Sequence, residues 1–219
     1  MTNGNPLIPS HVYVDGFNLY YGAVKGTPYK WLDISKMVQL LLPKNQVLKI
    51  KYFTAKVNPR PRDPDQPLRQ QIYFRVLRTI PNLEIILGHF LSHEVDMPLV
   101  NCPPGQQRYA HVIKTEEKGS DVNLAVHMLH DAYQGLYSAA IIISNDSDLV
   151  EAIKIVRNEL RKAVIILNPF VDPMKGRPSL ELQKVANFVK PIRVGVLAAS
   201  QFPDPIKDRT GSFHKPITW

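Results

Sequence analysis

The chain contains two short, continuously apolar runs, Ala139–Ile143 (AAIII) and Ala163–Leu167 (AVIIL). A strand that is apolar at every position must be covered on both faces, as in the parallel sheets of α/β proteins. The segment between them, Asp148–Leu160, has the length of a helix. Because parallel strands need a crossover connection of about a dozen residues or more, the pattern predicts a strand–helix–strand unit.

The same alternation of strands and helices runs along the rest of the chain. Further strands are expected at His11–Asp15, Val47–Thr54, Leu83–Leu91, Arg108–Lys114 and Ile192–Leu197. Further helices are expected at Phe17–Val24, Ile34–Leu42, Leu68–Ile80, from an N-cap at Ser120, and at Leu180–Phe188. The segment His93–Gly105 has no clear period and is expected to be irregular. These elements predict one α/β domain, a parallel sheet flanked by helices on both faces.

Composition narrows the class of protein. The formal net charge is +8 and the pI is about 9.5, which favours a polyanionic partner such as nucleic acid. Cys102 is the only cysteine, which excludes an intrachain disulfide and a cysteine-based metal cage. No run approaches the ~18 apolar residues of a membrane span. With no signal-peptide pattern at the N-terminus, the expected location is the cytoplasm.

Acidic residues follow the predicted strands at the places where parallel sheets form their sites. Asp15 ends the first strand, Asp146 and Asp148 follow the AAIII strand, and Asp121 lies in the first turn of a helix. Close carboxylates repel one another unless a cation neutralises them, and Mg²⁺ prefers oxygen ligands. Each acid has an ordinary alternative as a helix cap or first-turn residue. Together they predict a divalent metal site that could activate water against a phosphodiester.

Three segments carry a resemblance to a known family. They are VDGFNLYY at 14–21, KGSDVNLAVHML at 118–129 and IISNDSDLVEAI at 142–153. In this order they resemble the blocks of the NYN domain family, the LabA-like branch of the PIN-like nuclease superfamily. The resemblance implies a Rossmann-like (PIN-like) domain over residues 1–190 and a ribonuclease that uses Mg or Mn. Residues 191–219 would be a C-terminal extension that could pack on the domain, because it carries Phe202, Phe213 and Trp219.

The resemblance also assigns roles residue by residue. Asp15 and Asn18 match the acid and amide of the first block, Asp121 the middle acid, and Asp146 and Asp148 the pair in the third block. These four aspartates are the expected catalytic and metal-binding residues. The chain departs from the family pattern at three positions, with His127 in place of a further Asp, Asn145 in place of Gly, and Leu149 in place of an aromatic residue.

Substrate contacts are expected around this acidic centre. The predicted substrate-binding residues are Asn18, Lys114, Lys118, Ser144 and Asn145. Lysines before Asp121 could guide a phosphate backbone, although a solvated charged loop is an equal alternative. Aromatic residues after the first acid could stack on unpaired bases, which favours single-stranded RNA, with DNA as an alternative. A homodimer or a regulatory protein partner is also an option.

Other function classes fit the sequence less well. A catalytically weak or inactive module that binds RNA or a partner protein is the main alternative, and His127 favours it. A phosphatase with an aspartyl nucleophile needs a second acid where this chain has Phe17. A dehydrogenase is disfavoured because no GxGxxG follows the first strand. Cys102 has no identifiable base beside it, so a cysteine hydrolase lacks support.

Overall fold

The computed structural model describes residues 6–103, 105, 107–172, 174 and 176–219. Residues 1–5 of the expected domain lie outside the described residues. Among the described residues, none of the helices combines the length and the apolar character that crossing a bilayer requires.

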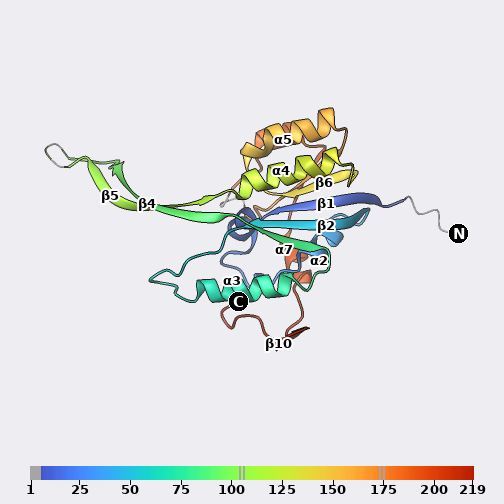
Figure 1. The fold of residues 1–219 in the computed structure, drawn as a ribbon, viewed down its shortest axis with the longest axis horizontal. Coiled ribbons are helices and arrows are strands. Elements are labelled where there is room, and N and C mark those ends of the chain that lie inside the picture. Colours follow the sequence, from blue (N-terminus) through green and yellow to red (C-terminus); the bar gives the residue numbers. More distant parts are fainter. Residues whose placement is uncertain (1–5, 104, 106, 173, 175) are drawn as a thin grey trace.

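Six strands of the described residues form one parallel sheet (Figure 1). In spatial order they are β3 (Leu83–Leu87), β2 (Asn45–Thr54), β1 (Ile8–Asp15), β6 (Ala139–Ile143), β7 (Ala163–Asn168) and β8 (Phe188–Pro191). The chain runs outward from β1 to β3 and then returns to place β6 on the other side of β1. In such sheets, sites form beyond the carboxyl ends of the strands where the direction of winding changes. That point lies between β1 and β6.

Helices cover both faces of the sheet, as Figure 1 shows. One face packs against α1 (Gly16–Leu19), η1 (Tyr20–Val24), α2 (Ile34–Leu41), α3 (Gln66–Leu77) and α7 (Val194–Ala199). The other packs against α4 (Ser120–Tyr133), α5 (Val150–Lys154), η3 (Ile155–Glu159) and α6 (Leu180–Val185). Each face of the sheet carries its own hydrophobic core, and alternate residues of β1 pack into each. Val12 and Val14 lie in one core and Tyr13 in the other. The predicted fold class is confirmed.

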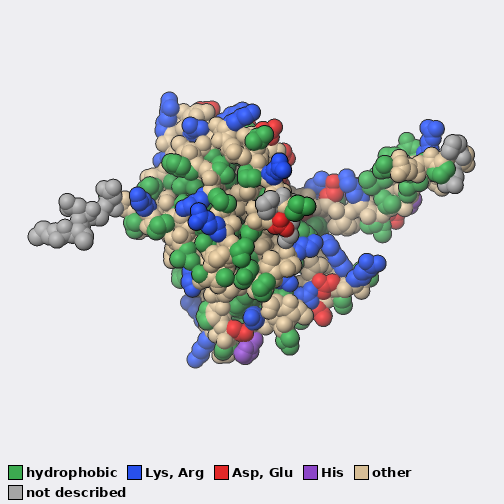
Figure 2. Space-filling view, turned by 180° about the vertical axis from the view of Figure 1, so that it is seen from behind, with side chains coloured by type: hydrophobic (Ala, Val, Ile, Leu, Met, Phe, Trp, Pro, Cys, Tyr) green, Lys and Arg blue, Asp and Glu red, His purple; other side chains and the backbone are tan. Residues whose placement is uncertain are grey.

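A long β-hairpin projects from the body (Figures 1 and 2). Its strands, β4 (His89–Pro98) and β5 (Tyr109–Lys118), pair antiparallel along their whole length. The expectation of an irregular segment at His93–Gly105 was therefore wrong for its first part, His93–Pro98. Both strands are largely exposed, and neither has a buried face. Their sequences therefore lack the alternation of apolar and polar residues by which strands are recognised. We call residues 89–118 the arm.

The C-terminal region differs from the expected pattern in its local structure. Ile192–Leu197 was predicted as a strand, but the sheet ends with β8 and Val194–Ala199 is helical. The apolar run in this segment reflects a helix with Leu197 buried on one side. Beyond it, β9 (Ile206–Asp208) and β10 (Gly211–Phe213) form a small hairpin. The last residue, Trp219, packs its ring 5.8 Å from the ring of Tyr73 on α3.

Candidate active site

Asp15 ends the central strand β1 and is held by the segments on either side of it. Its side chain is almost fully buried and caps α1, accepting from the backbone nitrogen of Asn18 at 2.9 Å. Its other oxygen, Oδ2, accepts from Asn18 Nδ2 at 2.5 Å and from Ser144 Oγ at 3.0 Å. Because β1 and β6 are neighbours, the turn after β6 reaches this carboxylate directly.

The turn after β6 places the second group of acids. Ser144 Oγ accepts from the backbone nitrogen of Asp146 at 3.1 Å while it donates to Asp15. Asp146 in turn caps the 3₁₀ turn η2 (Ser147–Leu149), because its Oδ1 accepts from the Asp148 nitrogen at 2.9 Å. Asn145 is fixed by its neighbours, since its nitrogen donates to Asn18 Oδ1 at 3.3 Å and its own Oδ1 accepts from Ser179. Asn18, Ser144 and Asn145 thus form the hydrogen-bonded frame that holds the acids.

Asp121 reaches the same edge of the sheet from α4. The arm ends at Lys118, and Gly119 adopts a left-handed conformation with φ 95° that turns the chain into the helix. The Glu117 side chain spans this turn, because its Oε1 accepts from Ser120 Oγ at 2.7 Å and from the Ser120 backbone nitrogen at 3.2 Å. Glu117 and Asp121 both line a cleft of about 230 Å³ together with Asp15, Asn18 and Arg60. Glu117 was missed in the sequence, where it lies in an unremarkable charged run.

The strand period explains why the predicted lysines do not reach this cleft. Residues two apart on a strand share a face, so Lys114, Glu116 and Lys118 lie together while Glu117 faces the other way. Glu116 binds both ammonium groups, at 2.7 Å from Lys114 and 3.2 Å from Lys118. Neither lysine lines the cleft, and the cation that does so is Arg60 from the proline-rich loop before α3.

The acids at this edge of the sheet affect one another electrostatically, although Asp146 and Asp148 lie outside the lining of the cleft. Burial raises the pKa of Asp15, although hydrogen bonds from Asn18 and Ser144 partly oppose this. The pKa of Asp121 rises to about 6, first through burial and then through the charges of neighbouring acids. In decreasing order of effect these neighbours are Asp15, Asp146, Glu117 and Asp148. The fold therefore brings the four predicted aspartates into mutual electrostatic range and adds Glu117 to them.

The donor set suits a hard divalent cation. Carboxylate oxygens are the preferred ligands of Mg²⁺, which is typically bound through one or two carboxylates and keeps several waters. Within the described residues, no three His, Cys, Asp or Glu side chains are grouped so as to enclose an ion. Asp15 and Asp146 instead direct oxygens to nearby backbone nitrogens. What favours a cation here is therefore the chemistry and mutual repulsion of the carboxylates, and not a preformed set of ligands among the described residues.

His127 belongs to a different cluster, between α4 and the sheet. Its Nδ1 lies 3.2 Å from Lys51 Nζ, and this buried lysine contacts both Asp131 oxygens at 2.7 and 2.9 Å. Tyr13 and His11 complete the cluster at 2.8 and 3.1 Å from Asp131 Oδ2. Burial opposes ionisation of Asp131, but hydrogen bonds led by that of Lys51 outweigh it and lower its pKa. The departure from the family pattern at His127 thus contributes to a buried ion pair.

Comparison with known proteins places the chain in a family. The NYN domain profile matches residues 9–190. The chain is 32% identical over 240 residues to 6-hydroxy-3-succinoylpyridine 3-monooxygenase HspA of Pseudomonas putida, an alignment that covers 96% of this chain and 75% of that protein. A crystal structure of a protein of unknown function from Vibrio parahaemolyticus shares the fold, with a TM-score of 0.54 and 15% identity over 97% of this chain and 100% of that one. The chain belongs to the NYN domain family, with the nuclease-type fold that this family implies.

Proposed function

We propose that this protein is a nuclease that hydrolyses phosphodiester bonds in single-stranded RNA with Mg or Mn. The observation that carries the proposal is the convergence of carboxylates that follow β1 and β6 and begin α4, whose charges add to burial in raising the pKa of Asp121 to about 6. Carboxylates that repel one another at neutral pH form a site for a divalent cation. A bound cation would stabilise charge on the phosphate and lower the pKa of water.

The remaining roles fall to residues at this edge of the sheet. Asp15 and Asp121 from the cleft, and Asp146 beside it, would supply carboxylate oxygens to the cation. Asp148, which is exposed, would complete the shell or accept the proton of the attacking water. Asn18 and Ser144 keep Asp15 in place by hydrogen bonds.

The choice of single-stranded RNA rests on charge and on the shape of the surface. Arg60 lies at the cleft, where its guanidinium would bind a phosphate of the strand. Lys and Arg side chains also gather where the arm leaves the body (Figure 2). Single strands can present their bases to aromatic side chains near this point, which duplexes cannot do without unstacking. DNA is the alternative strand, and a homodimer or a protein partner stays a prediction from the sequence.

A cleavage assay with a matched pair of variants tests the proposal. Asp121→Asn removes one charge from the cleft, while Glu151→Gln removes an exposed acid on α5 that pairs with Lys154. We expect Asp121→Asn to cleave labelled single-stranded RNA at least about 100-fold more slowly, since the lost stabilisation amounts to several kcal/mol. Glu151→Gln should cleave like the natural chain. Equal background from all three proteins, with RNA binding retained, would favour the inactive binding module instead.

A second candidate function is oxidation of a small heteroaromatic compound, as the name of the Pseudomonas putida relative states for that protein. The observation that favours it is a cavity of about 340 Å³, lined largely by aromatic side chains, beside the cleft. Incubation with 6-hydroxy-3-succinoylpyridine in air, with a reduced nicotinamide present, tests it by loss of the pyridine. If the protein consumes this pyridine compound and cleaves no RNA, the oxidation would be favoured over the nuclease proposal.

A further inference from the structure

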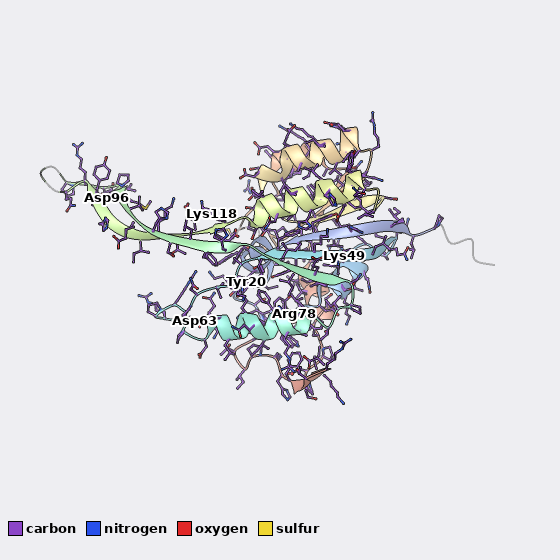
Figure 3. The ribbon with its side chains drawn as sticks, viewed as in Figure 1. Tyr20, Lys49, Asp63, Arg78, Asp96 and Lys118 are labelled. Atoms are coloured by element: carbon purple, nitrogen blue, oxygen red, sulfur yellow. The ribbon has the colours of Figure 1, made fainter. Side chains whose placement is uncertain are left out.

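The aromatic cavity lies under the first helical turns and is closed by the C-terminal residue. Seven aromatic residues line it, and these are Phe17, Tyr20, Tyr21, Tyr52, Tyr73, Phe74 and Trp219. Trp219 is held there by ring contacts with Trp31 at 6.4 Å and Tyr73 at 5.8 Å. In Figure 3, Tyr20 lies between the base of the arm at Lys118 and the loop at Asp63. The cavity's volume, about 340 Å³, is near the lower end of the ~300–1,000 Å³ usual for small-ligand sites.

The aromatic cavity adjoins the acidic cleft. Phe17, Tyr21 and Val57 line both. The Tyr52 ring lies directly against the residue after Asp15, because a Cβ on Gly16 would stand 2.7 Å from Tyr52 Cζ. Burial and then the Asp15 carboxylate raise the pKa of the Tyr52 hydroxyl, which also places this hydroxyl near the acids. A ligand in the cavity would therefore be a near neighbour of a phosphate in the cleft.

The polar groups of the cavity divide into those already bonded and those still available. Gln70 is bonded to Ala55 and Val57, and the Tyr73 hydroxyl donates to the Leu32 carbonyl. Among the described residues, the lining side chains whose polar ends show no hydrogen bond or ion pair include Tyr20, Tyr52 and Lys30. Two hydroxyls and one ammonium group, set among rings, fit a planar ring that carries hydrogen-bond acceptors at its edge.

We propose that the aromatic cavity binds one unpaired nucleobase of the strand whose phosphate lies in the acidic cleft. A base offers a flat face for the surrounding rings and carbonyl or ring-nitrogen acceptors for Lys30 and the tyrosine hydroxyls. The volume suits a single base with its ribose and not a stack of bases. The position of the strand rests on the proposed nuclease function, whereas binding of the base needs no cleavage.

Calorimetric titration of the full chain with single nucleotides tests this binding in the presence of a chelator. Uridine and adenosine 5′-monophosphates supply a base, and ribose 5-phosphate supplies the same phosphate without one. We expect at least one nucleotide to bind and ribose 5-phosphate to bind at least tenfold more weakly. No binding of either nucleotide up to millimolar concentrations, or equal binding of ribose 5-phosphate, would overturn the proposal.

Three variants locate the binding. Trp219→Ala should weaken the nucleotide at least about fivefold, the lower end of the effect of losing one stacking ring. Tyr52→Phe, which removes only a hydroxyl, should weaken it about fivefold, as expected for one lost hydrogen bond. Tyr133→Ala removes a 77% exposed ring on α4 and should change nothing. Circular dichroism checks that each variant folds, and unchanged affinity in both cavity variants would refute this location.

The outcomes for the base site and for the nuclease are separable. Nucleotide binding that depends on Trp219, without cleavage of RNA, would support the base site and contradict the nuclease proposal. Cleavage that depends on Asp121, with no nucleotide bound in the cavity, would do the reverse.

Discussion

Replacing Asp121 with asparagine should stabilise the folded protein when divalent cations are absent. The pKa of this carboxyl is raised from its ordinary value of 3.8 to about 6, first by burial and then by Asp15, Asp146, Glu117 and Asp148. The folded protein therefore binds this proton more tightly than the unfolded chain does. Stability falls as pH rises between 3.8 and about 6, and the full loss is present above that range.

The size of this effect follows from the shift and from the exposure of the side chain. A rise from 3.8 to about 6 corresponds to ~3 kcal/mol if it is fully transmitted, at ~1.4 kcal/mol per pH unit. Asp121 is only partly buried, so solvent screening reduces this to about 1–1.5 kcal/mol. The negative charge of Asp121 also interacts favourably with the helix dipole, because it lies in the first turn of α4. This interaction offsets ~0.5 kcal/mol of the destabilisation. We expect Asp121→Asn to gain about 0.5–1 kcal/mol at pH 8 and about half as much at pH 5.

Urea unfolding with a chelator at pH 5 and pH 8 measures the effect. Glu151→Gln is the control, because Glu151 also lies in the first turn of a helix but is exposed and pairs with Lys154. This variant should be no more stable than the natural chain at either pH. Added Mg²⁺ should reverse the order at pH 8, since the natural chain gains stability by binding the ion. A less stable Asp121→Asn at pH 8 with chelator would show that the acids do not repel one another.

Two further variants test how the fold supports the site. Asp131→Asn should lower the free energy of unfolding by about 3–5 kcal/mol in urea titrations, because it leaves the buried Lys51 without its anion; a loss below about 1 kcal/mol would contradict this. Gly88→Ala should lower the melting temperature by the equivalent of ~1–3 kcal/mol, because its Cβ would stand 2.5 Å from the backbone oxygen of Lys118 and 2.5 Å from Glu117 Oε1. Gly195→Ala, with open space around it, should be neutral or stabilising, and equal losses in both alanine variants would refute the contact.

The sheet was predictable from the sequence because its central strands are buried on both faces. AAIII and AVIIL appear as β6 and β7, and HVYVD forms the greater part of β1. The arm was less predictable because its alternating residues meet solvent on both sides and carry no contrast between core and surface. The helix at Val194–Ala199 was missed for a similar reason, since it is short and Leu197 is its only buried residue.

The acids at the carboxyl edge of the sheet were predictable to the extent that each lies at or just after the end of a strand or begins a helix. Asp15, Asp121 and Asp146 meet this condition, so topology alone brings them to one edge of the sheet. Glu117 is placed by the pairing of β4 with β5 and by the turn at Gly119, which depend on residues distant in sequence. The same pairing sends Lys114 and Lys118 to the opposite face from Glu117. Side-chain direction on a strand with no buried face is not encoded in a local pattern.

The acidic cleft and the aromatic cavity adjoin because neighbouring strands contribute to them, Asp15 of β1 to the cleft and Tyr52 of β2 to the cavity. Asp15 ends β1, and β2 runs parallel beside it with Phe53 paired to Asp15, so Tyr52 falls under the first turn of α1. Gly16 must lack a side chain for this to happen, since a Cβ there would come within 2.8 Å of the Phe53 carbonyl and the Tyr52 hydroxyl. A substitution at Gly16 would move the capping turn that holds Asp15 and the ring that lines the cavity together. Changes that reshape the cavity without disturbing the acids must therefore come from the other side, where the C-terminal Trp219 closes it.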